Sequence, residues 1–243
     1  MEEFNLAWLN WGFVDWNLVV KNYHFYVEGI WNTINLTVLA LAIGWLLSIP
    51  MAIARANRHP IFNFPVWCFT YFFRGTPLLV QAYLIYYGLG QFEGLRETFL
   101  WFFFEDAWFC ALFAFVLNSA AYQAEILRGS IEATPFGEVE AAKASGMSSW
   151  KRMHRIILPG AMRRTLPMYS NEVIFMLHGS VIASTITVID ILGAGRVVNG
   201  KYYVSYEGFL SAAVLYMILV FGISKIFKLL EHKYHVHLRP REA

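Results

Sequence analysis

The sequence predicts an all-α integral membrane protein with about five membrane-spanning helices. Of its 243 residues, 58% are hydrophobic and only 15% are charged, whereas soluble domains carry about 25% charged residues. Residues 34–53 contain no charged side chain, and about 20 consecutive apolar residues suffice for a helix to cross a bilayer. Lysine and arginine are also concentrated in alternate segments between the apolar runs, which is typical of a multi-pass membrane protein.

Five apolar runs follow one another along the chain, and we expect each of them to cross the membrane once. The second run is preceded by residues 60–73, an aromatic segment with prolines at its start and within it. This segment is interpreted either as an interfacial approach helix or as the first part of a long span. The expected spans are residues 34–53, 74–92, 107–127, 168–190 and 208–227.

The distribution of basic residues predicts that the N-terminus lies outside the cell and the C-terminus inside. In this orientation, 14 of the 19 lysines and arginines fall in inside segments and only four in outside segments. Cytoplasmic segments of membrane proteins carry such an excess of positive charge. The largest inside loop is then residues 128–165, between the third and fourth spans.

This loop has the sequence signals of two short helices that lie outside the membrane. Thr134 followed by Pro135 is typical of a helix start, and Gly146 is typical of a helix end. Ser148 is suited to cap a second helix over residues 149–158, which we expect Pro159 to end.

The second helix is expected to be amphipathic. Its apolar residues recur at helical spacing and are flanked by three basic residues. Such a helix between two spans must lie either on the bilayer or on a partner protein, and both alternatives stay open. The apolar stripe is Trp150, Met153, Ile156 and Ile157, and the flanking residues are Lys151, Arg152 and Arg155.

Seven residues of this loop form a pattern with fixed spacing, namely Glu140, Ala141, Ala142, Gly146, Ile156, Leu158 and Pro159. The pattern resembles the EAA loop of bacterial ATP-binding-cassette (ABC) importer permeases. In that family the loop is a cytoplasmic coupling helix that inserts into a groove on the ATPase subunit. The resemblance implies a type I ABC importer permease fold, with the coupling loop at residues 130–160. It also implies that the small Ala141, Ala142 and Gly146 let the two short helices approach closely.

The likeness continues through most of the chain from about residue 25. FRGTPLLVQ at residues 73–81 and NSAAYQAE at residues 118–125 resemble the polar amino acid uptake branch of the family. YSNEVI at residues 169–174, followed by MLH, is similar to the M-type membrane subunit of histidine and lysine/arginine/ornithine importers. The resemblance implies one permease domain over residues 1–243, with its core at 30–240, which imports histidine and basic amino acids across the bacterial inner membrane.

Polar residues inside the expected spans are candidates for the solute pathway, because charges in a bilayer are costly and mark functional or tightly paired positions. Arg74 is expected to pair with a carboxylate or with backbone carbonyls at a helix break formed with Gly75, Thr76 and Pro77; the alternative is a role in handling solute. Glu125 either anchors the coupling loop or contacts solute.

Two further pairs of polar residues carry similar alternatives. Asn118 and Tyr122 lie four residues apart on one helix face, where they either line the pathway or join helices by hydrogen bonds. Glu172 and His178 either meet a cationic side chain of the solute or have buried structural roles.

The chain is not expected to be an enzyme or to hold a metal or another cofactor. Residues 195–201 fit most of a phosphate-binding loop, but Tyr202 stands where a serine or threonine must bind Mg²⁺. ATP and Mg²⁺ are therefore expected on a separate ATPase subunit. The expected partners are a cytoplasmic ATPase dimer, a second permease subunit that is a copy or a paralogue, a periplasmic amino-acid-binding protein and the lipid bilayer, but no nucleic acid.

Three alternatives to this function stay open. In the first alternative, the solute is another polar amino acid or an opine. In the second, the chain is an ion-coupled secondary carrier. A carrier is expected to show sequence repeats and interrupted helices, and no repeat is evident. A membrane scaffold without a transport role leaves the coupling loop unexplained.

Overall fold

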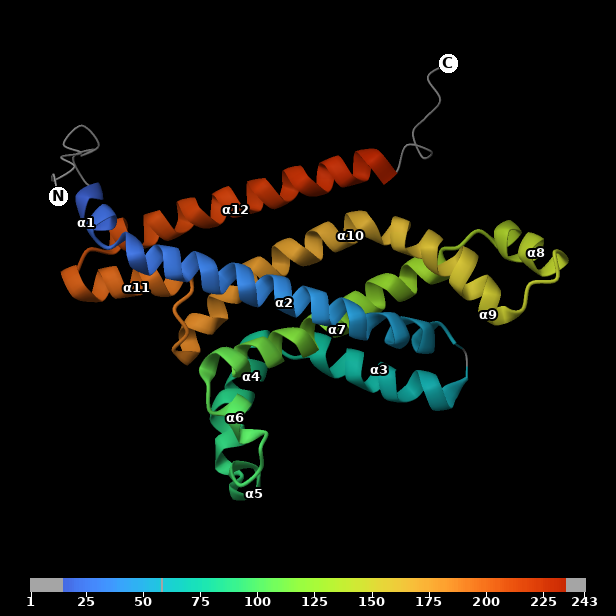
Figure 1. The fold of residues 1–243 in the computed structure, drawn as a ribbon, viewed down its shortest axis with the longest axis horizontal. Coiled ribbons are helices and arrows are strands. Elements are labelled where there is room, and N and C mark those ends of the chain that lie inside the picture. The colour runs from blue at the N-terminus through green and yellow to red at the C-terminus, as the bar shows by residue number, and fades with distance from the viewer. Residues whose placement is uncertain (1–14, 58, 235–243) are drawn as a thin grey trace, which may run out of the picture. The chain divides into compact units, whose positions relative to one another are not determined.

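The computed structural model describes residues 15–57 and 59–234, and the regular structure in this part of the chain is entirely helical (Figure 1). The elements are α1 (Trp16–Lys21), α2 (Tyr23–Ala56), α3 (Pro60–Gly75), α4 (Leu78–Tyr83), a π-helix (Leu84–Gly88), a 3₁₀ turn (Leu89–Gln91), α5 (Glu93–Arg96), α6 (Trp101–Phe104), α7 (Ala107–Glu132), α8 (Phe136–Ala144), α9 (Ser149–Arg152), a second π-helix (Met153–Ile157), α10 (Leu158–Gly179), a 3₁₀ helix (Ser180–Ile186), α11 (Ile191–Tyr202) and α12 (Ser205–Tyr234).

The chain folds into two compact units, each built from segments that are distant in sequence. Among the described residues, the first takes in those up to Val38 together with Leu78–Phe115 and Met176–Phe221, and the second contains Leu39–Pro77, Val116–Phe175 and those from Gly222 to Tyr234. The expectation of a single domain over residues 1–243 stays a prediction.

Three helices of the described residues are long and apolar enough to cross a membrane: Tyr23–Ala56, Ala107–Glu132 and Ser205–Lys233. They contain the predicted spans 34–53, 107–127 and 208–227. A fourth candidate is a pair of helices, Ser149–Ile186 and Ile191–Tyr202, bent by 43°. The predicted fourth span, 168–190, overlaps the end of the first of these helices, and the backbone turns at Thr187, which has a positive φ of 74°.

The expected second span, residues 74–92, is interrupted near its start, because α3 ends at Gly75 and α4 begins at Leu78; the helix break expected at Gly75, Thr76 and Pro77 is therefore confirmed. α3 already begins at Pro60, so the aromatic segment 60–73 is the first part of a long, interrupted element. The helix stops because Thr76 adopts an extended conformation, with φ −112° and ψ 143°. A residue that precedes proline is driven out of the helical region by the proline ring, and here Pro77 follows directly.

The prediction that Pro159 ends a short helix is wrong, because the helix continues without a break from α9 into α10. A π-helical turn precedes the proline, and in it the Leu158 amide donates to the carbonyl oxygen of Met153. This wider turn changes the hydrogen-bond pattern just before the residue that has no amide hydrogen. The loop between α7 and α10 therefore leads directly into the fourth candidate span.

The second unit has a core of small and branched side chains where α2, α7 and α10 pack together. Close approach is required between α2 and α7, because a Cβ atom on Gly44 would lie 3.1 Å from the Ala120 backbone nitrogen. The buried core residues are Ala52, Leu127, Ile131, Leu158 and Ala161.

In the first unit, glycines let helices approach backbone to backbone. A Cβ atom on Gly195 of α11 would lie 2.7 Å from the carbonyl oxygen of Gly208 of α12. A Cβ atom on Gly29 of α2 would lie 2.6 Å from the carbonyl oxygen of Asp190, which caps α11. Gly195 thus belongs to a helix and packs against another helix, which gives the phosphate-loop-like glycine a structural role.

Candidate coupling loop and intramembrane polar site

The turn at Gly146 is the most sharply defined feature of the loop between α7 and α10. α8 ends at Ala144, and Gly146 has a φ of +72°. The Gly146 amide donates to the Lys143 carbonyl at 2.9 Å, and the Met147 amide donates to the Ala142 carbonyl at 3.1 Å. These two bonds make a Schellman motif, in which a left-handed residue satisfies the last carbonyls of a helix.

The glycine is therefore explained by backbone conformation and not by close approach. A Cβ atom on Gly146 would meet nothing within 4 Å, so the expectation that this glycine lets the two short helices approach is wrong. Ala142 is buried while Ala141 is exposed, so only the former packs against the rest of the loop.

The start of the loop is held by Arg164 of α10. Its Nε donates to the Ser130 carbonyl at 3.2 Å, and its Nη2 donates to the Thr134 hydroxyl at 2.7 Å. The prediction that Thr134 caps a helix is wrong, because its hydroxyl donates backward to the Ile131 carbonyl at 2.7 Å. The predicted cap at Ser148 is confirmed, since its hydroxyl accepts the Lys151 amide.

The loop presents large aromatic side chains outward. Phe136 is 75% exposed and Trp150 is 71% exposed, and the Trp150 ring lies 3.6 Å from the His154 ring. Glu140 pairs with Lys143 at 2.7 Å on the same exposed loop. Of the remaining pattern residues, Leu158 is buried in the core, Ile156 is half-buried and Pro159 is exposed. Such a surface suits a partner that covers it.

A row of polar residues on α7 meets the interrupted end of α3. Asn118 Nδ2 donates to the Phe73 carbonyl at 3.1 Å, and the Tyr122 hydroxyl donates to the Arg74 carbonyl at 3.4 Å. The last carbonyls of a helix have no partner within it. α7 therefore supplies donors where α3 stops, next to Thr76 and Pro77.

Glu125 continues this row and is surrounded by arginines. Its carboxylate accepts from Arg55 Nε at 2.7 Å and from Arg128 Nε at 2.8 Å, and Arg74 lies 3.9 Å away. The Thr70 hydroxyl donates to it at 3.2 Å. With a side chain only 9% exposed, Glu125 joins α2, α3 and α7 through one buried charge.

The Arg74 side chain is partly exposed, although its backbone carbonyl accepts a hydrogen bond from the Tyr122 hydroxyl. Its side chain is 45% exposed and lies over the Tyr122 ring, 5.3 Å from the centroid. Gly75 and Pro77 beside it are exposed, and a Cβ atom on Gly75 would meet nothing within 4 Å.

Glu172 is a second buried carboxylate in the second unit, on α10, with 6% of the residue exposed. Tyr169 lies one helical turn before it on α10. His178, the other residue predicted on this helix, is exposed and belongs to the first unit.

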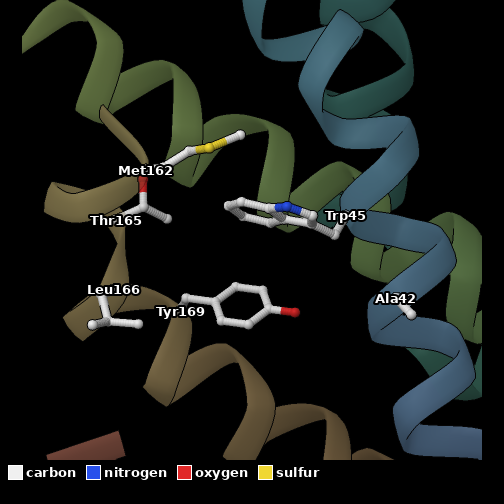
Figure 2. Close-up of a pocket in the computed structure, with 6 residues that line it drawn as sticks. All are labelled: Ala42, Trp45, Met162, Thr165, Leu166 and Tyr169. Carbon is white, nitrogen blue, oxygen red and sulfur yellow. The ribbon is translucent and has the colours of Figure 1, made fainter. Parts of the chain in front are cut away.

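A cavity of about 270 Å³ lies between α2 and α10 (Figure 2). Figure 2 shows the Trp45 indole extending from α2 and the Tyr169 ring extending from α10 into the space between the two helices. Their ring centroids are 5.0 Å apart at an interplanar angle of 64°. The other lining residues are Ala42, Met162, Thr165 and Leu166.

Sequence reasoning did not find Trp45 as a site residue. It lies in the most apolar run of the chain, where one tryptophan has no distinguishing signal. A signal for the α10 side does exist, since Met162, Thr165, Tyr169 and Glu172 follow helical spacing and share one side of the helix. Within residues 15–57 and 59–234, no group of three or more His, Cys, Asp or Glu side chains is arranged to hold a metal ion.

The family match and the similar proteins are all membrane components of transport systems. Residues 27–236 match the family described as "Binding-protein-dependent transport system inner membrane component". The octopine transport system permease protein OccM of Rhizobium radiobacter is 44% identical over 84% of both chains. The histidine/lysine/arginine/ornithine transport system permease protein HisM of Escherichia coli K12 is 42% identical over 87% of this chain and 90% of that protein.

Solved structures show the same fold. One described as "Crystal structure of an amino acid ABC transporter with histidines" has a TM-score of 0.81 and 32% identity, and covers 90% of this chain and 99% of that chain. An inward-facing structure of the MetNI methionine ABC transporter, at 17% identity, has a TM-score of 0.70 and covers 87% of this chain and 97% of that chain.

Replacing Glu125 by glutamine is expected to destabilise the protein, because Arg55, whose side chain is 13% exposed, loses its counter-charge. Removing one member of a buried ion pair costs about 3–5 kcal/mol. At the lower figure, the melting temperature in detergent should fall by about 6–12 °C for a chain of this size.

Glu132→Gln is the matched control, because it removes only the pair between Arg128 and a carboxylate that is 53% exposed. Such surface pairs are worth about 0.3–0.5 kcal/mol, so a shift of about 1 °C is expected. Equal shifts for the two variants would show that Glu125 is not a central structural charge.

Proposed function

We infer, since this chain belongs to the family of binding-protein-dependent transport system inner membrane components, that it is the membrane-spanning permease subunit of an ABC importer of amino acids. The family match covers most of the chain, and relatives named as amino acid or opine permeases include one that is 44% identical over 84% of it and one that is 42% identical over 87% of it. The coupling loop is the structural observation that carries this function, because the short helix α8 and the exposed start of the helix that continues into α10 together present an aromatic surface.

The same proposal assigns the partners. A cytoplasmic ATPase dimer binds the loop at residues 130–160, and that dimer holds ATP and Mg²⁺, so this chain needs no cofactor of its own. A second permease subunit completes the pathway, and a periplasmic binding protein delivers solute to the outer side of the bacterial inner membrane. Phe136 and Trp150 support the first assignment, since large exposed aromatic side chains are common anchors in protein interfaces.

The proposed solutes are histidine and other basic amino acids. The relatives named for histidine, lysine, arginine and ornithine transport support this class. Glu125 is already neutralised by arginines, which makes Glu172 the buried carboxylate of the second unit that is suited to a cationic solute. Opines are the second candidate class, because octopine and nopaline permeases are 44% and 37% identical to this chain.

An ion-coupled carrier is the competing mechanism, and energy dependence separates the two. An ABC permease in proteoliposomes imports solute only with its ATPase subunits and ATP. Uptake that is driven by an ion gradient without those subunits would support the carrier.

Substitution of Gly146 tests the coupling role through its backbone conformation. Gly146→Val places a β-branched residue at φ +72°, a conformation that costs ordinary residues about 1–2 kcal/mol. We expect ATP-driven uptake to fall by about 5- to 30-fold while membrane insertion persists.

Gly146→Asn is the matched control, because asparagine tolerates the left-handed conformation and a Cβ atom meets nothing here. It should retain most of the transport. If Gly146→Asn lowered uptake as much as Gly146→Val, coupling would require a small side chain at a docked surface and not a left-handed backbone. If uptake were unchanged in both variants, Gly146 would have no role in coupling.

Substitution of Glu172 tests the solute charge. Glu172→Gln should weaken import of lysine or arginine more than import of a neutral amino acid, because a charge-assisted hydrogen bond is worth about 1.5–3 kcal/mol, or about one to two decades in affinity. Uptake by the assembled complex is the measurement. An equal loss for charged and neutral solutes would assign Glu172 to structure instead.

A further inference from the structure

We propose that the cavity between α2 and α10 holds the cationic end of the solute's side chain, with Trp45 and Tyr169 as the residues that favour a positive charge there. The proposal rests on the proposed function and specifies the substrate class of the same protein. It assigns a role to the two aromatic residues that line the cavity in Figure 2 and contact each other edge to face.

The lining of the cavity suits a cation and not an anion. None of the six lining residues is charged, and two of them are aromatic. The Trp45 and Tyr169 rings stand at 64° to each other with centroids 5.0 Å apart, so they present differently oriented π surfaces. Ring faces attract ammonium and guanidinium groups, most strongly where water is excluded.

A counter-charge is available on the same side of α10. Tyr169 and Glu172 are three residues apart, so their side chains leave the helix as neighbours, and the two groups interact electrostatically. A cation in an apolar environment requires such a partner, since an unpaired charge there is strongly disfavoured. Glu172 does not line the cavity itself, but it lies one helical turn beyond Tyr169, which does.

The volume indicates which part of the solute enters. About 270 Å³ lies just under the range of about 300–1,000 Å³ for pockets that enclose a whole small ligand. The cavity therefore suits the end of a long side chain, while the amino and carboxylate groups of the solute remain outside it. A side chain that is long and cationic, such as that of arginine or lysine, fits this description.

The test compares arginine with citrulline, a neutral amino acid of nearly the same shape, in proteoliposomes that contain the intact importer complex. Tyr169→Leu and Trp45→Leu remove a π surface but leave an apolar side chain. Each should lower the ratio of arginine to citrulline uptake by about 3- to 30-fold, which corresponds to about 0.6–2 kcal/mol. Tyr169→Phe keeps the ring and should give an intermediate ratio.

Phe175→Leu is the matched control, because it removes an aromatic residue from the same helix at a position that is 70% exposed and does not line the cavity. Its uptake ratio should equal that of the wild type. The inference is overturned if Tyr169→Leu lowers arginine and citrulline uptake equally, which makes the cavity structural. It is also overturned if neither uptake changes, which means that another molecule, such as a lipid chain, occupies the cavity.

The wild-type complex separates this inference from the proposed function. If it imports amino acids without preferring arginine over citrulline, the cation pocket is wrong and the permease function stands. If it imports no amino acid with ATP, the proposed function fails and the cation pocket fails with it.

Discussion

The buried carboxylate of Glu125 is the constraint on which the second unit depends. It holds Arg55 of α2 and Arg128 of α7 within hydrogen-bonding distance, with Arg74 of α3 at 3.9 Å. One charge thus joins three helices where α3 is interrupted. Because a charge in a low-dielectric environment needs its partners, the arginines cannot separate without cost. Asn118 and Tyr122 of α7 donate hydrogen bonds to the end of α3, and their role in the solute pathway stays a prediction.

α10 connects the loop between α7 and α10 to the interior of the second unit. From Trp150 to Glu172 the chain is one continuous helix through a π turn, a distance of about 33 Å at 1.5 Å per residue. In the proposed function, this helix, which contains Pro159 and Pro167, links a displacement of the loop to the side chains beside the cavity. In the proposed function, ATP-driven movement at Trp150 changes the surroundings of the solute at Tyr169 and Glu172.

The sequence predicted the helical class, three of the spans and the turn at Gly146, because apolar length and a glycine stop are local signals. It also predicted the helix break before Pro77, but it failed at Pro159, which lies within a helix that continues. The outcome at Pro159 depends on whether neighbouring backbone groups find other partners, which a single sequence does not reveal. Trp45 was missed for a related reason, since a cavity forms only when two distant helices meet.

Photo-crosslinking from Trp150 tests the central claim, that this loop receives the ATPase subunit, most directly. A photoreactive amino acid would replace Trp150 in the intact complex, with a second variant at Tyr203, which is 91% exposed and is predicted to lie on the outer side. Light should join position 150 to the ATPase and position 203 to no ATPase. Crosslinks from position 150 to lipid alone would contradict the coupling role. ATPase adducts from position 203 would contradict the predicted orientation.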